Sequence, residues 1–276
     1  MKIAIIGMGF VGNALLNALN EDVKIAKIDP RLNTSVEDLL DFGPEITFIS
    51  VPTPMANELQ DLSILEEVTE QIESIDLDSL LVLKSTVLPN AISDLEKRFK
   101  RFIYNPEFLT EKNADNDFIR SPFILFGGSD KESKILSSFY KKHTKCETEN
   151  HLFVDAISAS LIKYSINTYL ATKVVFFNQL FDIFSASGSH EDWKTFTDAI
   201  SNDKRIGSSH MMVPGHDGRK GFGGACFPKD SYALYKYSKL LNVEFSLLKN
   251  VIDINNKIRL SYNDLSEREK NQNIDY

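Results

Sequence analysis

Cysteine is scarce in this sequence of 276 residues, which contains only Cys146 and Cys226. Two cysteines so far apart do not make a disulfide framework and are typical of a reducing compartment, so we expect a cytoplasmic protein. Long apolar runs are also lacking: no stretch of 18 apolar residues occurs, and no segment is predicted to span a membrane. Glycines interrupt the apolar start of the chain, which is not the pattern of a secretory signal.

An excess of positive charge is absent too, because 39 acidic residues outnumber 31 basic ones and the net charge is -8. This balance argues against general nucleic-acid binding, so an anionic substrate needs a local cluster of Lys, Arg and backbone amides. The five histidines are scattered, and no metal-ligand spacing is found. The length and the hydrophobic content of 42% fit one large or two modest globular domains.

The first motif is G-x-G-x-x-G, formed by Gly7, Gly9 and Gly12. An apolar run at 2–6 precedes it, as in a buried parallel strand, and a helical pattern follows. In this context the first glycine makes a tight turn, the second lets a pyrophosphate approach the backbone, and the third lets the helix pack on the strand. The sequence therefore predicts a dinucleotide-binding site here.

An acidic residue ends the next predicted strand. Residues 23–28 read as that strand, and Asp29 follows, 17 residues after Gly12. A carboxylate at this place accepts hydrogen bonds from the ribose 2′-OH and repels a 2′-phosphate, which favours NAD over NADP. Arg31 lies close by and leaves NADP open.

Apolar runs alternate with helical patterns over the first 150 residues. The runs predict strands at 45–51, 80–83, 102–104 and 123–126, and an amphipathic pattern predicts a helix at 62–75. This alternation predicts an α/β fold with a Rossmann-type, doubly wound parallel sheet over residues 1–153. Polar groups follow the strands, with Pro52 and Thr53 after one and Lys84, Ser85 and Thr86 after the next, at the sheet edge where such folds bind ligands.

A pair of acids follows the strand at 102–104. If a helical turn begins near Pro106, Glu107 and Glu111 lie on one face at i, i+4. Two carboxylates near a nicotinamide are suited to acid/base work. Taken alone, the pair fits a solvated acidic helix face better, because acids at this spacing are common on surfaces.

The composition becomes helical after residue 150, which predicts an all-α domain at 154–276. Residues 155–185 contain no Pro or Gly, and so long a helix favours a homodimer. Lys163 and Asn167 share a face of it, although a solvated lysine covering apolar neighbours is the usual interpretation of such a residue. Further helices are predicted at 193–200 and 234–258, the polar tail 266–276 is expected to fray, and the long loop 201–224, with Lys204 and Arg205, is expected to be functional.

The loop continues into Gly221-Phe222-Gly223-Gly224-Ala225-Cys226-Phe227-Pro228-Lys229-Asp230. The glycines permit positive φ and a close approach to a ligand. Pro228 suits the first turn of a helix, so Cys226 is expected just before a helix N-terminus and beside Lys229, and both features lower a thiol pKa. This pattern predicts a nucleophile. The alternative is a buried apolar cysteine in a glycine-rich turn.

Taken together, these motifs resemble one family. G-x-G-F-V-G, VPTP, KSTV, NPEFLTE, K-x-x-x-N and GFGGACFPKD occur in the order seen in the UDP-glucose/GDP-mannose dehydrogenase family, from residue 1 to about 258. The resemblance does not include the family's further α/β domain, which grips the nucleotide of the substrate. It implies a Rossmann-type domain followed by an all-α central and dimerisation domain similar to the C-terminal domain of 6-phosphogluconate dehydrogenase.

In that family NAD oxidises an alcohol twice to a carboxylate, through a cysteine thiohemiacetal and thioester. The resemblance implies a nucleotide-sugar substrate, first of all UDP-glucose oxidised to UDP-glucuronate for polysaccharide biosynthesis. It implies Cys226 as the nucleophile, Glu107 as acid/base supported by Thr86, and Lys163, Asn167 and Asp230 as holders of the substrate oxygen and the hydrolytic water. The implied NAD residues are Gly7, Gly9, Phe10, Val11, Gly12, Asp29, Pro52, Thr53, Thr86 and Glu111. The implied substrate residues are Glu107, Phe108, Leu109, Glu111, Lys163, Asn167, Arg205, Phe222, Gly223 and Lys229.

Two other hypotheses stay open. A Rossmann domain followed by a Lys-x-x-x-Asn helix also characterises two-electron dehydrogenases of smaller hydroxy acids or alcohols, for which Cys226 is dispensable. The chain could also be an inactive NAD-binding fragment or subunit that needs a partner chain.

Overall fold

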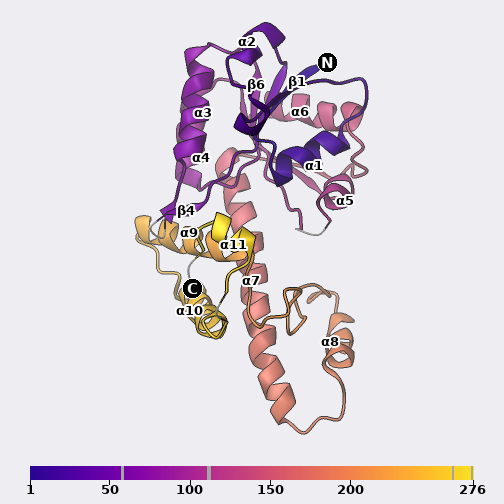
Figure 1. The fold of residues 1–276 in the computed structure, drawn as a ribbon. Helices are drawn as coiled ribbons and strands as arrows, with labels where there is room; N and C mark the ends of the chain where they lie inside the picture. The colour runs from indigo at the N-terminus through magenta and orange to yellow at the C-terminus, as the bar shows by residue number, and fades with distance from the viewer. Residues whose placement is uncertain (57–58, 111–112, 263, 275) are drawn as a thin grey trace. The chain divides into compact units, whose positions relative to one another are not determined.

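The computed structural model describes residues 1–276 except 57–58, 111–112, 263 and 275. The chain forms two compact units (Figure 1). Unit 1 contains Met1–Thr53 and Asp61–Lys163, and unit 2 contains Pro54–Gln60 and Tyr164–Tyr276. Helix α7, Ala156–Ala186, begins in unit 1 and continues into unit 2, because the division falls after Lys163.

Unit 1 is an α/β unit built on one twisted sheet, whose strand order is β2-β1-β3-β6-β7-β8-β9. The strands are β1 Lys2–Ile6, β2 Lys24–Ile28, β3 Ile46–Ile49, β6 Leu80–Leu83, β7 Phe102–Tyr104, β8 Ile124–Gly128 and β9 His151–Val154. The helices are α1 Phe10–Ala18, α2 Asp38–Phe42, α3 Ser63–Ser74, α4 Pro89–Arg98, α5 Ala114–Ile119 and α6 Asp130–His143, with a 3-10 turn at Pro30–Leu32. These elements confirm the predicted α/β fold.

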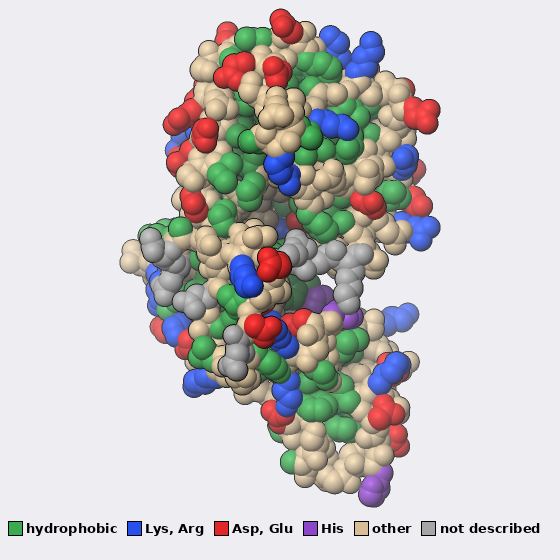
Figure 2. Space-filling model, in the orientation of Figure 1, with side chains coloured by type: hydrophobic (Ala, Val, Ile, Leu, Met, Phe, Trp, Pro, Cys, Tyr) green, Lys and Arg blue, Asp and Glu red, His purple; other side chains and the backbone are tan. Residues whose placement is uncertain are grey.

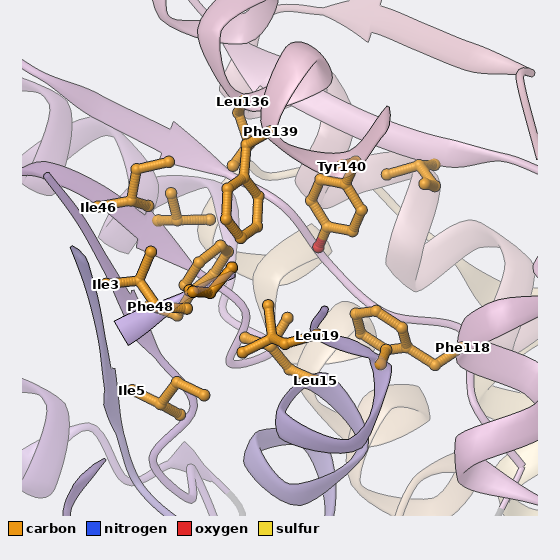
Figure 3. Packing of buried hydrophobic residues seen from close by; sticks show 14 of the residues in the cluster. Ile3, Ile5, Leu15, Leu19, Ile46, Phe48, Phe118, Leu136, Phe139 and Tyr140 are labelled. Carbon is orange, nitrogen blue, oxygen red and sulfur yellow. The ribbon is translucent and has the colours of Figure 1, made fainter. Parts of the chain in front are cut away.

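Side chains alternate between the two faces of this sheet, as the period of a strand requires. Ile3 and Ile5 of β1 pack in one apolar cluster with α1, α5 and α6, to which Phe139 of α6 belongs (Figure 3). Ala4 and Ile6 of the same strand pack in a second cluster with α2, α3, α4 and the start of α7. Helices therefore cover both faces, which explains why the strands read as continuous apolar runs.

The sheet is not parallel throughout, contrary to the prediction. β7 and β8 pair antiparallel, with Ile103 opposite Gly128, while the other neighbouring strands of this sheet pair in parallel. Among the residues described between β7 and β8, the only helix is the short α5, which packs against α1. The described part of this connection therefore contains no crossover helix that would return the chain for a parallel strand. Strand β9 was not predicted, because Leu152 and Phe153 are exposed and the run lacks the buried pattern.

The connections from β1 define where a ligand can bind. β1 pairs with β2 on one side and with β3 on the other, so the strand order reverses beside β1. In open α/β sheets, ligands bind outside the carboxyl ends of the strands at such a switch point. The glycine motif follows β1 and the Pro52–Thr53 segment follows β3, so both lie at this edge.

Unit 2 is mainly helical. Its elements are the larger part of α7, α8 Trp193–Ser201, α9 Phe227–Leu240, α10 Ser246–Arg259, α11 Glu267–Asn271 and a hairpin of β4 Met55–Ala56 with β5 Leu59–Gln60. Ala171 and Val175 of α7, Phe222 and Val251 form its buried cluster, which joins α7 to the glycine-rich loop and to α10. None of the helices described is long and apolar enough to cross a membrane.

Two predictions for unit 2 were wrong. The helix expected at 234–258 is two helices, because the chain turns at Asn242 with a φ of 56°, a left-handed conformation that ends a helix. The tail expected to fray instead contains α11 and the buried side chain of Glu269, and Asn273 donates a hydrogen bond of 2.8 Å to the carbonyl of Met55. The helices expected at 155–185 and 193–200 are confirmed as α7 and α8.

Candidate active site

The glycine motif forms a cradle between β1 and α1. A Cβ added to Gly12 lies 2.1 Å from the carbonyl oxygen of Gly7, so only glycine lets α1 start this close to the strand. A Cβ added to Gly9 meets no atom within 4 Å, which shows that the backbone there borders open space. Phe10 and Val11 begin α1 directly after Gly9, its N-cap. A helix N-terminus with open backbone in front of it fits the pyrophosphate of a dinucleotide.

Asp29 lies at the end of β2 and is buried beside this cradle. Its carboxylate accepts hydrogen bonds from the backbone N–H of Met8 at 2.8 Å and from the guanidinium of Arg31 at 2.9 and 2.8 Å. The hydrogen bond from Arg31 is the main cause that holds the pKa of Asp29 well below its usual range, so the carboxylate is charged at neutral pH. The arginine that left NADP open is therefore paired with the acid that favours NAD.

The loops after β3 and β6 are tied to each other. Thr53 donates a hydrogen bond of 2.9 Å to the carbonyl of Thr86, and Ser85 donates one of 2.6 Å to the carbonyl of Val51. Pro52, between these contacts, is exposed. Lys84 was expected at the open edge of the sheet, but its ammonium is buried, where it donates to Asn105 Oδ1 at 2.9 Å.

A second polar group in unit 1 joins α7 to the segment after β7. Lys163 Nζ lies 3.5 Å from Glu107 Oε1 and also donates to the carbonyl of Glu107. Both side chains are nearly buried, at 4% and 12% exposure. The ammonium lies 5.0 Å from the ring centroid of Phe108, and Leu109 N–H donates to Glu107 Oε2 at 2.6 Å. The structure thus brings together four of the predicted substrate residues.

The local structure of this segment differs from the expectation. Residues 105–110 contain no helix, so the predicted turn at Pro106 is wrong for this part of the chain. Glu107 is held by the N–H of Leu109 instead of by a helical ladder. Glu111 lies outside the described residues. The solvated acidic face does not apply to Glu107, and the snorkelling interpretation does not apply to Lys163, because both are buried in contact with each other.

A buried polar group in unit 2 lies between α7 and α9. Asn167 Nδ2 donates to Asp230 Oδ2 at 2.6 Å, and Lys229 Nζ donates to Asp230 Oδ1 at 2.6 Å. The exposed fractions of these residues are 7%, 1% and 6%. Each oxygen of the carboxylate therefore has a donor of its own, and the group fixes the first turn of α9.

Cys226 is the N-cap residue of α9, and Pro228 is in the first turn, as predicted. Its carbonyl accepts the N–H of Asp230 at 2.8 Å, which places the carboxylate one turn after the thiol. Gly221 and Gly224 have φ values of 75° and 79°, which confirms the expected positive φ in this loop. Cys226 is partly exposed, and Cys146 and Cys226 are not joined in a disulfide. A cysteine at a helix N-terminus after a glycine-rich loop is in a position suited to a nucleophile.

Arg205 follows α8 in the loop of unit 2. Its guanidinium is exposed and pairs with Asp203 at 2.6 Å in the same loop. Lys173 of α7 fixes the following residues by donating to the carbonyls of Ile206 and Gly207 at 2.9 and 3.1 Å. Basic and acidic side chains are interspersed over the visible face of each unit (Figure 2).

The side chains that hold the glycine-rich loop were not predicted from the sequence. Asn178, Asn255, Arg259 and Glu269 are buried and contact the loop backbone from α7, α10 and α11. One signal for them was present: Asn255 and Arg259 interrupt the buried stripe of α10, where a polar residue needs a partner. Glu269 has no such signal, because the tail around it is polar throughout.

Comparisons with known proteins agree with this geometry. Residues 31–144 match the NAD binding domain of the UDP-glucose/GDP-mannose dehydrogenase family, and residues 157–257 match its central domain. UDP-glucose 6-dehydrogenase of Rickettsia bellii is 33% identical over 92% of this chain and 67% of its own length. The chain belongs to the UDP-glucose/GDP-mannose dehydrogenase family.

Other members of the UDP-glucose/GDP-mannose dehydrogenase family are similar over the same region. GDP-mannose 6-dehydrogenase of Pseudomonas savastanoi is 29% identical over 92% of this chain and 68% of its own length. A UDP-glucose dehydrogenase structure from Pyrobaculum islandicum superposes with a TM-score of 0.76 at 26% identity, covering 93% of this chain and 68% of that one.

Two conclusions follow from these matches. The match to an NAD binding domain confirms NAD as the predicted cofactor. The chain spans 60% to 67% of the length of the rickettsial UDP-glucose 6-dehydrogenases that it matches.

Proposed function

We propose that this chain carries the NAD-binding and central parts of a nucleotide-sugar dehydrogenase that oxidises UDP-glucose to UDP-glucuronate in two hydride transfers. Family membership supports the nucleotide sugar, and relatives named UDP-glucose 6-dehydrogenase favour UDP-glucose. Residues 1–153 are the proposed NAD domain and residues 154–276 the proposed helical domain. The observation that carries the covalent route is Cys226 at the N-cap of α9, one turn before Asp230.

NAD supplies the hydride acceptor for both oxidations. In the first, a base takes the proton of the primary hydroxyl as hydride leaves its carbon, which yields an aldehyde. Glu107 is the proposed base, because its carboxylate is nearly buried and accepts a hydrogen bond from the N–H of Leu109. Thr86 is proposed to support it. The ammonium of Lys163 stabilises the negative charge that develops on the substrate oxygen.

The thiol separates this route from a simple alcohol oxidation. The thiolate of Cys226 adds to the aldehyde carbon, a C–S bond forms and the oxygen takes up a proton, so the reactive aldehyde is not released. Loss of a second hydride from the same carbon to NAD, with the hydroxyl proton passing to Glu107, gives a thioester. Water held by Asn167 and Asp230 attacks the thioester carbonyl as Asp230 takes one of its protons. The C–S bond breaks with the thiolate of Cys226 leaving, and the product acid releases its proton to solvent as the carboxylate. Arg205, Phe222, Gly223 and Lys229 are proposed to contact the substrate.

Counting NADH tests this proposal. UDP-glucose, GDP-mannose and a small panel of related nucleotide sugars are offered to wild type, to Cys226→Ser and to Cys146→Ser as the matched control. Two NADH per sugar from wild type and from the control, and none from Cys226→Ser, support the proposal. No NADH with any UDP- or GDP-sugar contradicts it.

The same assay separates the other hypotheses. One NADH per molecule of a smaller hydroxy acid, with full turnover by Cys226→Ser, indicates the two-electron dehydrogenase. Bound NAD without turnover, and turnover restored by a partner chain, indicate an incomplete subunit. A cytoplasmic location stays a prediction from the cysteine content.

We also propose a homodimer formed through α7. Tyr169, Phe176 and Ile183 are spaced by seven residues along the helix and are 63%, 59% and 66% exposed. A stripe of large apolar side chains at this spacing is typical of a helix-helix interface. Phe176→Asp is expected to give a monomer in light scattering, whereas Leu240→Asp, at an equally exposed site on α9, leaves the dimer intact. A wild-type monomer at micromolar concentration contradicts this proposal.

A further inference from the structure

The glycine-rich loop before Cys226 is held by side chains through its backbone. Gly221 N–H donates to Asn178 Oδ1 at 2.9 Å, and Phe222 N–H donates to Asn255 Oδ1 at 2.7 Å. The amide of Asn255 also donates to the carbonyl of Phe222 at 3.0 Å. These two asparagines are on α7 and α10, in the folded core of unit 2. They fix the first half of the loop, four or more residues before the cysteine.

The second half of the loop is held from a different part of the chain. Gly224 N–H, two residues before Cys226, donates to Glu269 Oε1 at 3.2 Å. A Cβ added to Gly223 lies 1.9 Å from a guanidinium nitrogen of Arg259 and 2.6 Å from Glu269 Oε1, so this ion pair packs directly on the loop backbone. Ordinary packing does not need two buried charges here. We infer instead that the ion pair of Arg259 and Glu269 holds the loop backbone in one position.

Glu269 is itself fixed by several donors. Arg259 donates to Oε1 at 3.0 Å, the hydroxyl of Tyr276 donates to Oε1 at 2.6 Å, and the N–H of Ser266 donates to Oε2 at 2.7 Å. Arg259 and Glu269 are 3% and 1% exposed. Burial raises the pKa of the Glu269 carboxyl, but the hydrogen bonds from Tyr276, Ser266 and Arg259 outweigh it and lower the pKa to about 2. A buried carboxylate with this many donors keeps its place and its charge.

The segment that carries Glu269 is fastened to the long loop at further points. Lys220 N–H donates to the hydroxyl of Tyr262 at 2.8 Å, and Arg219 pairs with Asp264 at 2.9 Å. Arg259 also pairs with Asp217 at 2.8 Å. Among the described residues of 262–276, which we name the strap, Tyr262, Asp264 and Glu269 thus contact the loop between Arg219 and Gly224.

We propose that Glu269, with Arg259, is a positioning residue for the Cys226 loop, and that the strap fixes the backbone from which the nucleophile acts. This inference rests on the proposed function in assigning the chemistry to Cys226. Loss of Glu269 removes the acceptor of Gly224 N–H and leaves the guanidinium of Arg259 without its buried partner. The loop then moves, and a displacement of about 1 Å at a reacting group costs on the order of 100-fold in rate.

Two measurements on the full chain test this proposal. Hydrogen-deuterium exchange of peptides covering 221–227 reports the hold on the loop without any need for activity. Steady-state kinetics report its effect on turnover. The variants are Glu269→Ala, the milder Tyr276→Phe, and Glu267→Ala as the matched control, since Glu267 is an exposed carboxylate on the same helix.

In Glu269→Ala we expect faster exchange at 221–227 and a fall of kcat by about 100-fold with the KM for NAD unchanged, because the NAD cradle is in unit 1. If this variant does not fold, Tyr276→Phe, which removes one hydrogen bond, is expected to lower kcat about threefold with faster exchange. The control should match wild type. Unchanged exchange in folded Glu269→Ala overturns the proposal. A third outcome separates the two proposals. If Glu269→Ala shows faster exchange but Cys226→Ser keeps full turnover, the proposed function is wrong, while the proposal that the strap fixes the loop is still supported.

Discussion

We predict that the preference for NAD over NADP depends on the carboxylate of Asp29, and Asp29→Asn is the sharpest test of this prediction. Asparagine keeps the shape of the side chain and removes its charge. Asp29 now accepts Met8 N–H and pairs with Arg31. Without the charge, Arg31, whose side chain is 70% exposed, is released and can pair with a 2′-phosphate.

The size of the effect follows from electrostatics. The repulsion between a phosphate charge and a carboxylate about 4 Å away is roughly 4 kcal/mol at an effective dielectric constant near 20. Arg31 already neutralises part of the carboxylate, and a hydrogen bond to a charged group contributes about 1.5–3 kcal/mol. We therefore expect Asp29→Asn to lower the ratio of NAD to NADP affinity by about 10-fold to 100-fold.

Fluorescence titration with NADH and NADPH measures this ratio directly. Asp41→Asn, which neutralises an exposed carboxylate of α2 in the same unit, is the control and should leave the ratio unchanged. If Asp29→Asn binds both cofactors with the wild-type ratio of affinities, the acid at the end of β2 does not select NAD.

Two further predictions concern unit 1. Gly12→Ala places a methyl group 2.1 Å from the Gly7 carbonyl, so we expect lost NADH binding and a free energy of unfolding lower by about 1–3 kcal/mol, measured by titration and urea unfolding. Burial lowers the pKa of Lys84 from its usual 10.5 to about 8. Between these pH values the unfolded state binds more protons than the folded state, so the contribution of Lys84 to the free energy of unfolding rises with pH. The stability of wild type minus that of Lys84→Met should rise by about 3 kcal/mol from pH 7.5 to 10.5, and a flat difference contradicts the burial of a charged lysine.

The parts of the fold that the sequence predicted are those set by local patterns. The strand, the glycines and the helix of the NAD cradle adjoin one another in the chain, so their types and spacing are sufficient to predict them. Pro228 and the glycines likewise predicted the start of α9 at Phe227. The antiparallel pairing of β8 was missed because strand direction depends on a partner 20 or more residues away, as with Ile103 and Gly128.

The site was predictable in its residue types and less so in its contacts. Lys163 and Glu107 are 56 residues apart, and Asn167 and Asp230 are 63 apart, so no spacing rule joins them. These residues meet because α7 contacts both the segment after β7 and the first turn of α9. Glu269 was the hardest to predict, because a carboxylate in a polar tail reads as solvated until Arg259 and Gly224 are seen beside it.

The covalent route requires that the substrate carbon becomes bonded to the sulfur of Cys226. We would quench the reaction with UDP-glucose and NAD in acid during turnover and measure the mass of the peptides that contain each cysteine. Asp230→Asn, in which attack by water should slow, is run beside wild type. We expect an acyl-sugar-nucleotide mass on the Cys226 peptide, strongest in Asp230→Asn, with the Cys146 peptide unmodified. Steady NADH formation with the Cys226 peptide unmodified in both proteins contradicts the covalent route.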